Sequence, residues 1–170
     1  MRALRVKAGA GEVVLSTMKT HISNAGVVEK GCGALWTLAV NAENQVALMK
    51  AGADEVVLSA MKRHTLNAGI AWRGCGALWT FARNNADNQV TLMKAGAGEV
   101  VLSAMKAHKS NAGVAESGCG ALVNLALNAD NKVTLMKAGA IDTIERALQV
   151  HLASTDVQFQ GQRALNSLKP

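Results

Sequence analysis

Apolar residues along this chain recur with the period of an α-helix and not with the alternation of a β-strand. Between residues 11 and 21 they form one such stripe: Val13, Val14, Leu15 and Met18. Between residues 25 and 40, a turn of 100° per residue places further side chains within about 60° of Cys32: Val28, Leu35, Trp36 and Ala39. Each segment is therefore predicted to be a helix with one buried face.

The remaining positions of the predicted helix 25–40 lie away from that face. Three polar residues project about 140–180° from it, toward an open surface: Lys30, Thr37 and Asn41. Gly31 and Gly33 lie about 100° to either side. Because glycine in a helix interior costs roughly 1 kcal/mol relative to alanine, we expect these two glycines to allow close approach of the equivalent helices before and after.

The whole pattern returns every 43 or 44 residues. Gly-Cys-Gly-Ala-Leu stands at 31–35, 74–78 and 118–122, and Lys-Ala-Gly-Ala stands at 7–10, 50–53, 94–97 and 137–140. Such a period is typical of a stack in which each unit buries its apolar face on its neighbours. The chain is thus predicted to be one all-α domain, 1–170, with units of these approximate bounds: 1–41, 42–85, 86–128 and 129–170.

Each complete unit is predicted to contain three helices. The short first helix, such as 44–51, offers Val46, Leu48 and Met49 for burial. A glycine follows it where a left-handed residue ends a helix, at Gly9, Gly52, Gly96 and Gly139. An asparagine is predicted to cap the third helix, at Asn24, Asn67 and Asn111.

The units at the two ends depart from this pattern. Residues 1–8 match the end of a short helix, so the first unit is incomplete, and its uncapped N-terminal end is predicted to allow self-association. The last unit has predicted helices at 141–152, longer than its counterparts, and at 156–168. Its drift from the repeat indicates a C-terminal cap with a polar outer face. The second unit carries one extra residue, because 83–87 replaces 40–43, and this extra Asn is expected in a turn.

Composition restricts the partners and the compartment. The core must be aliphatic, since the 170 residues include only two Phe, three Trp and no Tyr. The net charge of +6 favours acidic partners. The three cysteines lie at matched positions on helices that would stack about 8–10 Å apart, too far for a disulfide. We therefore expect a reducing, intracellular setting, cytoplasmic or nuclear, and no membrane contact, because no apolar run approaches the ~18–20 residues of a span.

The sequence shows no pattern of residues for catalysis, metal binding or a cofactor. The repeated histidines, His21, His64, His108 and His151, would lie one unit apart, too far to share an ion at ligand distances of about 2 Å. The repeated cysteines lie at the centre of the predicted buried face, where Cys acts as a small apolar residue. We expect no enzyme, no metal and no cofactor.

The helix order, the glycine after the short helix and the pattern Ala-Leu-x-x-Leu-Ala in the third helix resemble the armadillo repeat over 1–170. The resemblance implies a right-handed α-solenoid whose third helices line a concave groove that holds an extended peptide. In that family an Asn in Ala-Leu-x-Asn-Leu binds the peptide backbone, and Asn124 matches it. Thr37, Thr80 and Ser167 occupy its place elsewhere, and Gly33, Gly76 and Gly120 stand where one family branch has a tryptophan.

The predicted groove carries one unit with a distinctive substitution. Trp72 stands beside Arg73 at the place of Glu29 and Glu116 in the other units. We hypothesise that Trp72, Arg73, Thr80 and Arg83 anchor an extended acidic or phosphorylated segment, since Arg donates bidentate hydrogen bonds and Trp supplies apolar area. The full candidate set for partner binding is Lys30, Thr37, Asn41, Trp72, Arg73, Thr80, Arg83, Asn84, Asn124 and Asn128.

Three other interpretations stay open at this point. In the first, Trp72 lies over a neighbouring third helix and the two arginines are only solvated. In the second, which the close similarity of the three central units raises, the array is engineered or recently duplicated and has no evolved ligand. Scattered substitutions and the one-residue insertion argue against a strict consensus design. In the third, the positive charge attracts nucleic acid without sequence preference. Dispersed cations and the lack of an aromatic platform argue against this third interpretation.

Overall fold

The computed structural model describes residues 9–169, which fold into eleven α-helices without a β-strand. In order they are α1 (Ala10–Thr20), α2 (Ala25–Leu38), α3 (Ala42–Lys50), α4 (Ala53–Arg63), α5 (Ala68–Ala82), α6 (Ala86–Lys94), α7 (Ala97–Ala107), α8 (Ala112–Leu125), α9 (Ala129–Lys137), α10 (Ala140–Val150) and α11 (Thr155–Leu168). The prediction of a helical end at 1–8 lies outside the described residues.

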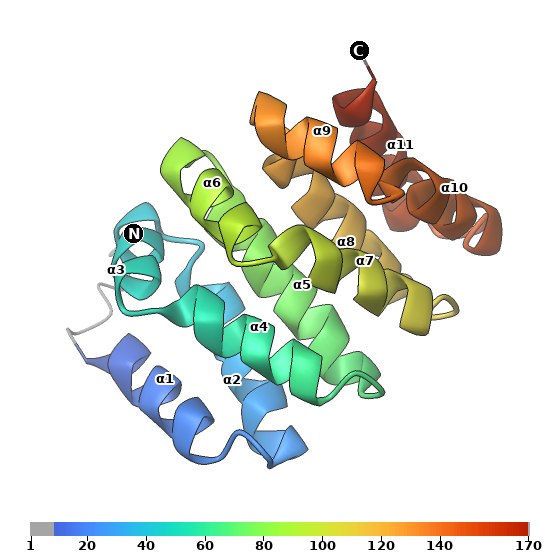
Figure 1. The fold of residues 1–170 in the computed structure, drawn as a ribbon. Coiled ribbons are helices and arrows are strands. Elements are labelled where there is room, and N and C mark those ends of the chain that lie inside the picture. Colours follow the sequence, from blue (N-terminus) through green and yellow to red (C-terminus); the bar gives the residue numbers. More distant parts are fainter. Residues whose placement is uncertain (1–8, 170) are drawn as a thin grey trace, which may run out of the picture.

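The helices stack as the repeat predicts (Figure 1). The third helices of the units, α2, α5, α8 and α11, pack side by side along one face of the array. The second helices α1, α4, α7 and α10 form a parallel row on the other face, and the short helices α3, α6 and α9 lie along one edge (Figure 1). Contacts are much denser within the row of third helices than within the row of second helices. The array therefore curves toward the third helices, which form its inner surface.

The turns between helices follow the residues predicted for them. Gly52, Gly96 and Gly139 have positive φ angles of 80°, 90° and 80°, the left-handed region that glycine enters without steric cost. Asn67 caps α5, because its side-chain oxygen accepts a hydrogen bond of 2.9 Å from the backbone N–H of Ile70. Asn24 and Asn111 cap α2 and α8 in the same way.

The inserted residue of the second unit lies in the turn, as predicted, but it shifts the register by one. Asn84 adopts φ 54°, and Asn85 caps α6 through a bond of 3.0 Å from Asn88 N–H. Asn41 and Asn128 cap α3 and α9. Asn85 is therefore the counterpart of Asn41 and Asn128, so the candidate set, which lists Asn84 together with these two, names the wrong asparagine of this turn. The same caps start the short helices at Ala42, Ala86 and Ala129, earlier than the predicted 44.

The core is aliphatic and lies between the rows of helices. On α2 the predicted face is buried at Val28, Cys32, Leu35 and Ala39. Trp36 is only half-buried, because its ring extends along the inner surface to α5 and not into the core.

The short helix α3 and the last unit differ from expectation. Leu48 is buried, Met49 is half-buried and Val46 is exposed, because the amide Gln45 takes the inward position. The Nε2 of Gln45 donates to the backbone carbonyls of Thr80 and Arg83 in the next unit. In the last unit, α10 has 11 residues like α1, α4 and α7, so the predicted longer helix 141–152 is wrong. No helix within residues 9–169 has the length and apolar character needed to cross a membrane.

Candidate functional site

The two glycines of each Gly-Cys-Gly motif contact different neighbours. A Cβ added to Gly76 of α5 would lie 2.5 Å from the indole Cδ2 of Trp36 on α2, the third helix of the preceding unit. A Cβ added to Gly74 would lie 2.5 Å from Sδ of Met61, which belongs to the second helix of the same unit. The second glycine therefore faces an adjacent third helix as predicted. The first glycine does not, because each unit must also close on its own second helix.

Four side chains from α2 and α5 form a connected cluster on the inner surface, which we call the Trp–Arg cluster: Glu29, Trp36, Trp72 and Arg73. The rings of Trp36 and Trp72 meet edge to face, with centroids 6.0 Å apart and planes at 85°. The guanidinium carbon of Arg73 lies 4.9 Å from the centroid of Trp72. Arg73 Nε also donates to Glu29 Oε1 at 3.2 Å, while 35% and 31% of the two side chains remain exposed.

Trp72 therefore lies over its neighbours, as one of the alternative interpretations states. It contacts Trp36, and a Cβ added to Gly113 of α8 would lie 3.1 Å from its Cδ1. Arg73, in contrast, is not only solvated. Its guanidinium is held by a carboxylate and a ring, which fixes its orientation at the surface while leaving part of it accessible.

The other two predicted cations lie outside the cluster's contacts. Lys30 is exposed on α2. Arg83, at the C-terminal end of α5, is exposed and donates from Nη2 to the carbonyl oxygen of Val40 at 3.0 Å. Arg73 and Arg83 thus both bridge the second unit to the first.

The sequence predicts that the third helices expose a row of polar side chains at Thr37, Thr80 and Asn124. Of these three side chains only Thr37 is exposed to solvent. Thr37 is exposed and donates to the Gly33 carbonyl at 3.1 Å. Thr80 is 5% exposed and donates to the Gly76 carbonyl, and Asn124 is 7% exposed. The Nδ2 of Asn124 donates at 2.9 Å to the carbonyl of Trp79 on the adjacent helix. The expected open row is wrong at Thr80 and Asn124, because adjacent third helices pack too closely there.

The asparagines at the edge of the array are engaged in helix starts. The side-chain oxygen of Asn41 accepts from Asn44 N–H at 3.0 Å, and that of Asn128 accepts from Asn131 N–H at 3.1 Å. Asn84 is exposed in its left-handed turn. The structure therefore brings Trp72 and Arg73 together and leaves Lys30 exposed on α2, and it places Arg83 and the asparagines at the far ends of the third helices.

The sequence reasoning did not identify a row of bonds that ties the units together. The ring Nε2 of His64, His108 and His151 lies 2.7, 2.8 and 2.9 Å from the carbonyl oxygens of Ile22, Thr65 and Lys109 in the preceding unit. Each ring must donate from Nε2, because a carbonyl only accepts. The fixed interval of the histidines was the available signal, and it marks an inter-unit bond.

Burial in the core determines the protonation state of the three cysteine thiols. Burial raises the pKa of Cys32, Cys75 and Cys119 from an ordinary 9.0 to about 12. Such thiols stay protonated at neutral pH and are poor nucleophiles. Burial, and then the nearby charge of Asp156, also raises the pKa of Glu116 on α8. Within residues 9–169, no cluster of three His, Cys, Asp or Glu side chains is arranged to hold a metal ion.

Comparison with protein families gives one match that spans most of the chain. The family model described as the LRRK2 ARM repeat matches residues 11–169. A comparison with curated proteins gives no match.

Among the solved structures similar to this chain are engineered proteins and designed armadillo repeat proteins. A crystal structure of an engineered protein superposes with a TM-score of 0.84 at 24% identity, over 95% of this chain and 64% of that chain. A designed armadillo repeat protein in complex with the peptide (KR)4 superposes with a TM-score of 0.81 at 23% identity, over 96% of this chain and 66% of that chain. A computationally designed armadillo repeat protein for modular peptide recognition has a TM-score of 0.79 at 24% identity, over 96% of this chain and 66% of that chain. The chain thus spans about two thirds of the length of these proteins, and at such identities the likeness shows the fold.

Proposed function

Because the chain belongs to the ARM-repeat family, described by the LRRK2 ARM repeat model that covers residues 11–169, we propose that it is a protein-interaction module. Its ligand is an extended acidic peptide segment, and its binding surface is the row of third helices around the Trp–Arg cluster. The observation that carries the proposal is the state of Arg73, which is held over Trp72 at 4.9 Å and is still 35% exposed.

The fold supports the peptide class of ligand. Two of the similar designed armadillo proteins are described by peptide recognition, one of them bound to (KR)4. That peptide consists of lysine and arginine, whereas this chain carries a net charge of +6. Like charges repel across an interface, so the ligand of this chain should have the opposite sign.

The arrangement of the cations also suggests how long the segment must be. Arg73 lies on α5 and Arg83 directly follows its last residue, about 15 Å away at a rise of 1.5 Å per residue. An extended peptide covers that distance in about five residues. Lys30, exposed on α2, is a third cation on the row of third helices. A segment with carboxylates about five residues apart can therefore contact Arg73 and Arg83 together.

The test is a titration with a fluorescent peptide of about eight residues in which Glu and Ala alternate, a length of roughly 26 Å when extended. The same peptide with Gln in place of Glu is the neutral control. The double variant Lys30→Gln/Arg73→Gln should weaken binding of the Glu peptide by about tenfold or more, since each charge-assisted hydrogen bond is worth more than 1 kcal/mol.

The matched control is Lys94→Gln/Lys137→Gln, which removes the same charge from exposed positions at the ends of α6 and α9. It should leave the affinity nearly unchanged. If both double variants lower the affinity equally, the attraction is only that of the net charge, and the proposed surface is wrong. Equal binding of the Glu and Gln peptides would reject the acidic ligand itself.

A further inference from the structure

The splayed second helices leave clefts on the outer face of the array, opposite the Trp–Arg cluster. One cleft of about 400 Å³ lies between α7 and α10, and Ala115 of α8 also lines it. A second, also about 400 Å³, lies one unit earlier between α4 and α7. The repeat makes the two clefts equivalent, so their differences can be compared position by position.

Four lining positions carry the same residue type in both clefts. Met105, Lys106, Ala115 and Ala147 in the later cleft match Met61, Lys62, Ala71 and Ala104 in the earlier one. Each cleft also has one carboxylate at the same place, Asp142 or Glu99. The turn at one end is fixed in the same way, because His151 bonds the carbonyl of Lys109 and His108 bonds that of Thr65.

Three positions differ, and the differences change the charge of the later cleft. Lys109 replaces Thr65, Arg146 replaces Ser103, and Thr143 replaces Val100. The later cleft therefore has three cations and one carboxylate, a formal charge of +2. In the earlier cleft one lysine and one glutamate cancel when the histidine is neutral. Of the two clefts, only the later one has this basic lining, which combines Lys109 of the third unit with Arg146 of the last.

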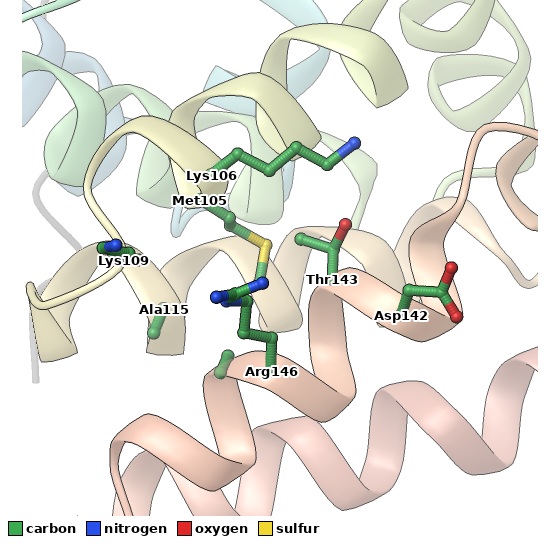
Figure 2. A pocket seen from close by; sticks show the side chains of 8 residues that line it. Met105, Lys106, Lys109, Ala115, Asp142, Thr143 and Arg146 are labelled. Atoms are coloured by element: carbon green, nitrogen blue, oxygen red, sulfur yellow. The ribbon is translucent and has the colours of Figure 1, made fainter.

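The cations of the later cleft are not used by the protein itself. Within residues 9–169, Lys106, Lys109 and Arg146 form no ion pair, and their charged groups donate no hydrogen bond. Arg146 rises from α10 beneath Met105, with Lys109 on one side and Thr143 and Asp142 on the other (Figure 2). The Thr143 hydroxyl donates to the Gly139 carbonyl at 2.9 Å, so the cations alone offer free donors.

We propose that the cleft between α7 and α10 binds the phosphate of a phosphorylated serine or threonine side chain in a protein partner. A phosphate monoester carries a charge near −2 at neutral pH and has acceptor oxygens for the Arg146 fork and the two lysines. The apolar lining residues Met105, Ala115 and Ala147 suit the carbon atoms attached to the phosphate. The lining has no aromatic ring on which a nucleotide base could stack.

The test is an NMR titration with a short alanine and glycine peptide that carries one phosphoserine, followed at the amides of residues 107–110 and 146. The unphosphorylated peptide, inorganic phosphate and vesicles with a phosphomonoester lipid are titrated in parallel. The phosphopeptide should shift these amides and bind more tightly than inorganic phosphate. Equal binding of both peptides, or tighter binding of phosphate or of vesicles, would overturn the proposal.

The repeat itself supplies the variants. Lys109→Thr/Arg146→Ser gives the later cleft the residues of the earlier one and should weaken phosphopeptide binding by about tenfold or more. Thr65→Lys/Ser103→Arg gives the earlier cleft the basic lining and should create a second site, seen as new shifts at residues 63–66. Lys30→Gln/Arg73→Gln on the inner face should not change phosphopeptide binding at the later cleft, and it should not create a site at the earlier one. Unchanged binding in the first variant would overturn the proposal, whatever the inner surface does.

Discussion

Trp36 of α2 lies against Gly76 of α5, where any side chain would collide with the ring: an added Cβ would be 2.5 Å from Cδ2. The same relationship returns one unit later, with Trp79 against Gly120 at 2.5 Å. A tryptophan from one third helix thus fills the space left by a glycine on the next. The packing of the ring offsets the roughly 1 kcal/mol that glycine costs in a helix interior.

We expect Gly76→Ala to lower the free energy of unfolding by about 1–2 kcal/mol. Overpacking costs about 1–3 kcal/mol, and the better helix propensity of alanine returns part of it. Urea unfolding followed by circular dichroism measures the change.

The matched control is Gly26→Ala near the start of α2, where the added Cβ would have only the Asn24 side chain nearby, at 3.4 Å. It should be neutral or slightly stabilising. A second control, Trp36→Leu, should make Gly76→Ala less costly in the double variant, since residues in contact are not additive. Equal effects of Gly76→Ala in both backgrounds would show that the ring contact is not the cause.

The repeat and the helical period were enough to predict the elements and the core, but not the contacts between units. The face of α2 around Cys32 follows from 100° per residue, because each helix has one side against the rest of the protein. The burial of Thr80 and Asn124 does not, because it depends on how closely adjacent third helices approach. The clefts depend in turn on how far the second helices splay. Such distances between elements are a property of the stack, and a one-dimensional pattern has no measure of them.

The row of histidines should contribute to stability through the bonds between units. His108→Ala removes the bond from Nε2 to the carbonyl of Thr65 and should lower the free energy of unfolding by about 1 kcal/mol. His21→Ala is the control, because the ring of His21 forms no hydrogen bond within residues 9–169. Urea unfolding of both variants checks the prediction, and equal losses would contradict a role for the inter-unit bond.

The buried thiols should make the protein less stable as the pH rises above about 9. The Cys75 thiol has a pKa near 9.0 in an exposed state and about 12 in the fold, raised first by burial and then by Cys119 and Cys32. Between these values the unfolded chain has lost a proton that the native state retains, so the free energy of unfolding falls with rising pH. Below the ordinary pKa of 9.0 the thiol is protonated in both the native and the unfolded state, so its contribution to the free energy of unfolding is fully present.

Because alkaline pH affects the stability of a protein in other ways as well, the measurement is a comparison with Cys75→Ala. The decrease in unfolding free energy between about pH 8 and pH 10 should be smaller in this variant than in the wild type. In the folded wild type, a thiol reagent should also react slowly at neutral pH, and urea should accelerate it. Identical pH dependence of the two proteins would show that Cys75 is not buried as the structure describes.

The left-handed conformation of Asn84 should restrict which residues this turn tolerates at position 84. Asn84 has φ 54°, which glycine adopts freely and a β-branched residue avoids. We expect Asn84→Gly to be neutral or slightly stabilising and Asn84→Val to cost about 1–2 kcal/mol. Asn85→Ala should cost about 1 kcal/mol, because it removes the cap of α6. Thermal melts of the three variants distinguish the two neighbouring asparagines, and a tolerated Asn84→Val would contradict the register of the turn.

Removing the charge of Glu29 should strengthen ligand binding at the proposed inner surface, although it removes a contact of the fold. Its carboxylate pairs with Arg73 at 3.2 Å, and both side chains are about one third exposed, so the pair should stabilise the fold by less than about 1 kcal/mol. In the free protein this carboxylate competes with an acidic ligand for the guanidinium. Glu29→Gln should therefore strengthen binding of the Glu peptide several-fold while lowering stability slightly. The control Glu43→Gln, at an exposed position of α3, makes the same change in net charge. If it strengthens binding as much as Glu29→Gln, then Arg73 is not a contact of the peptide, and the cluster serves only to join the first two units.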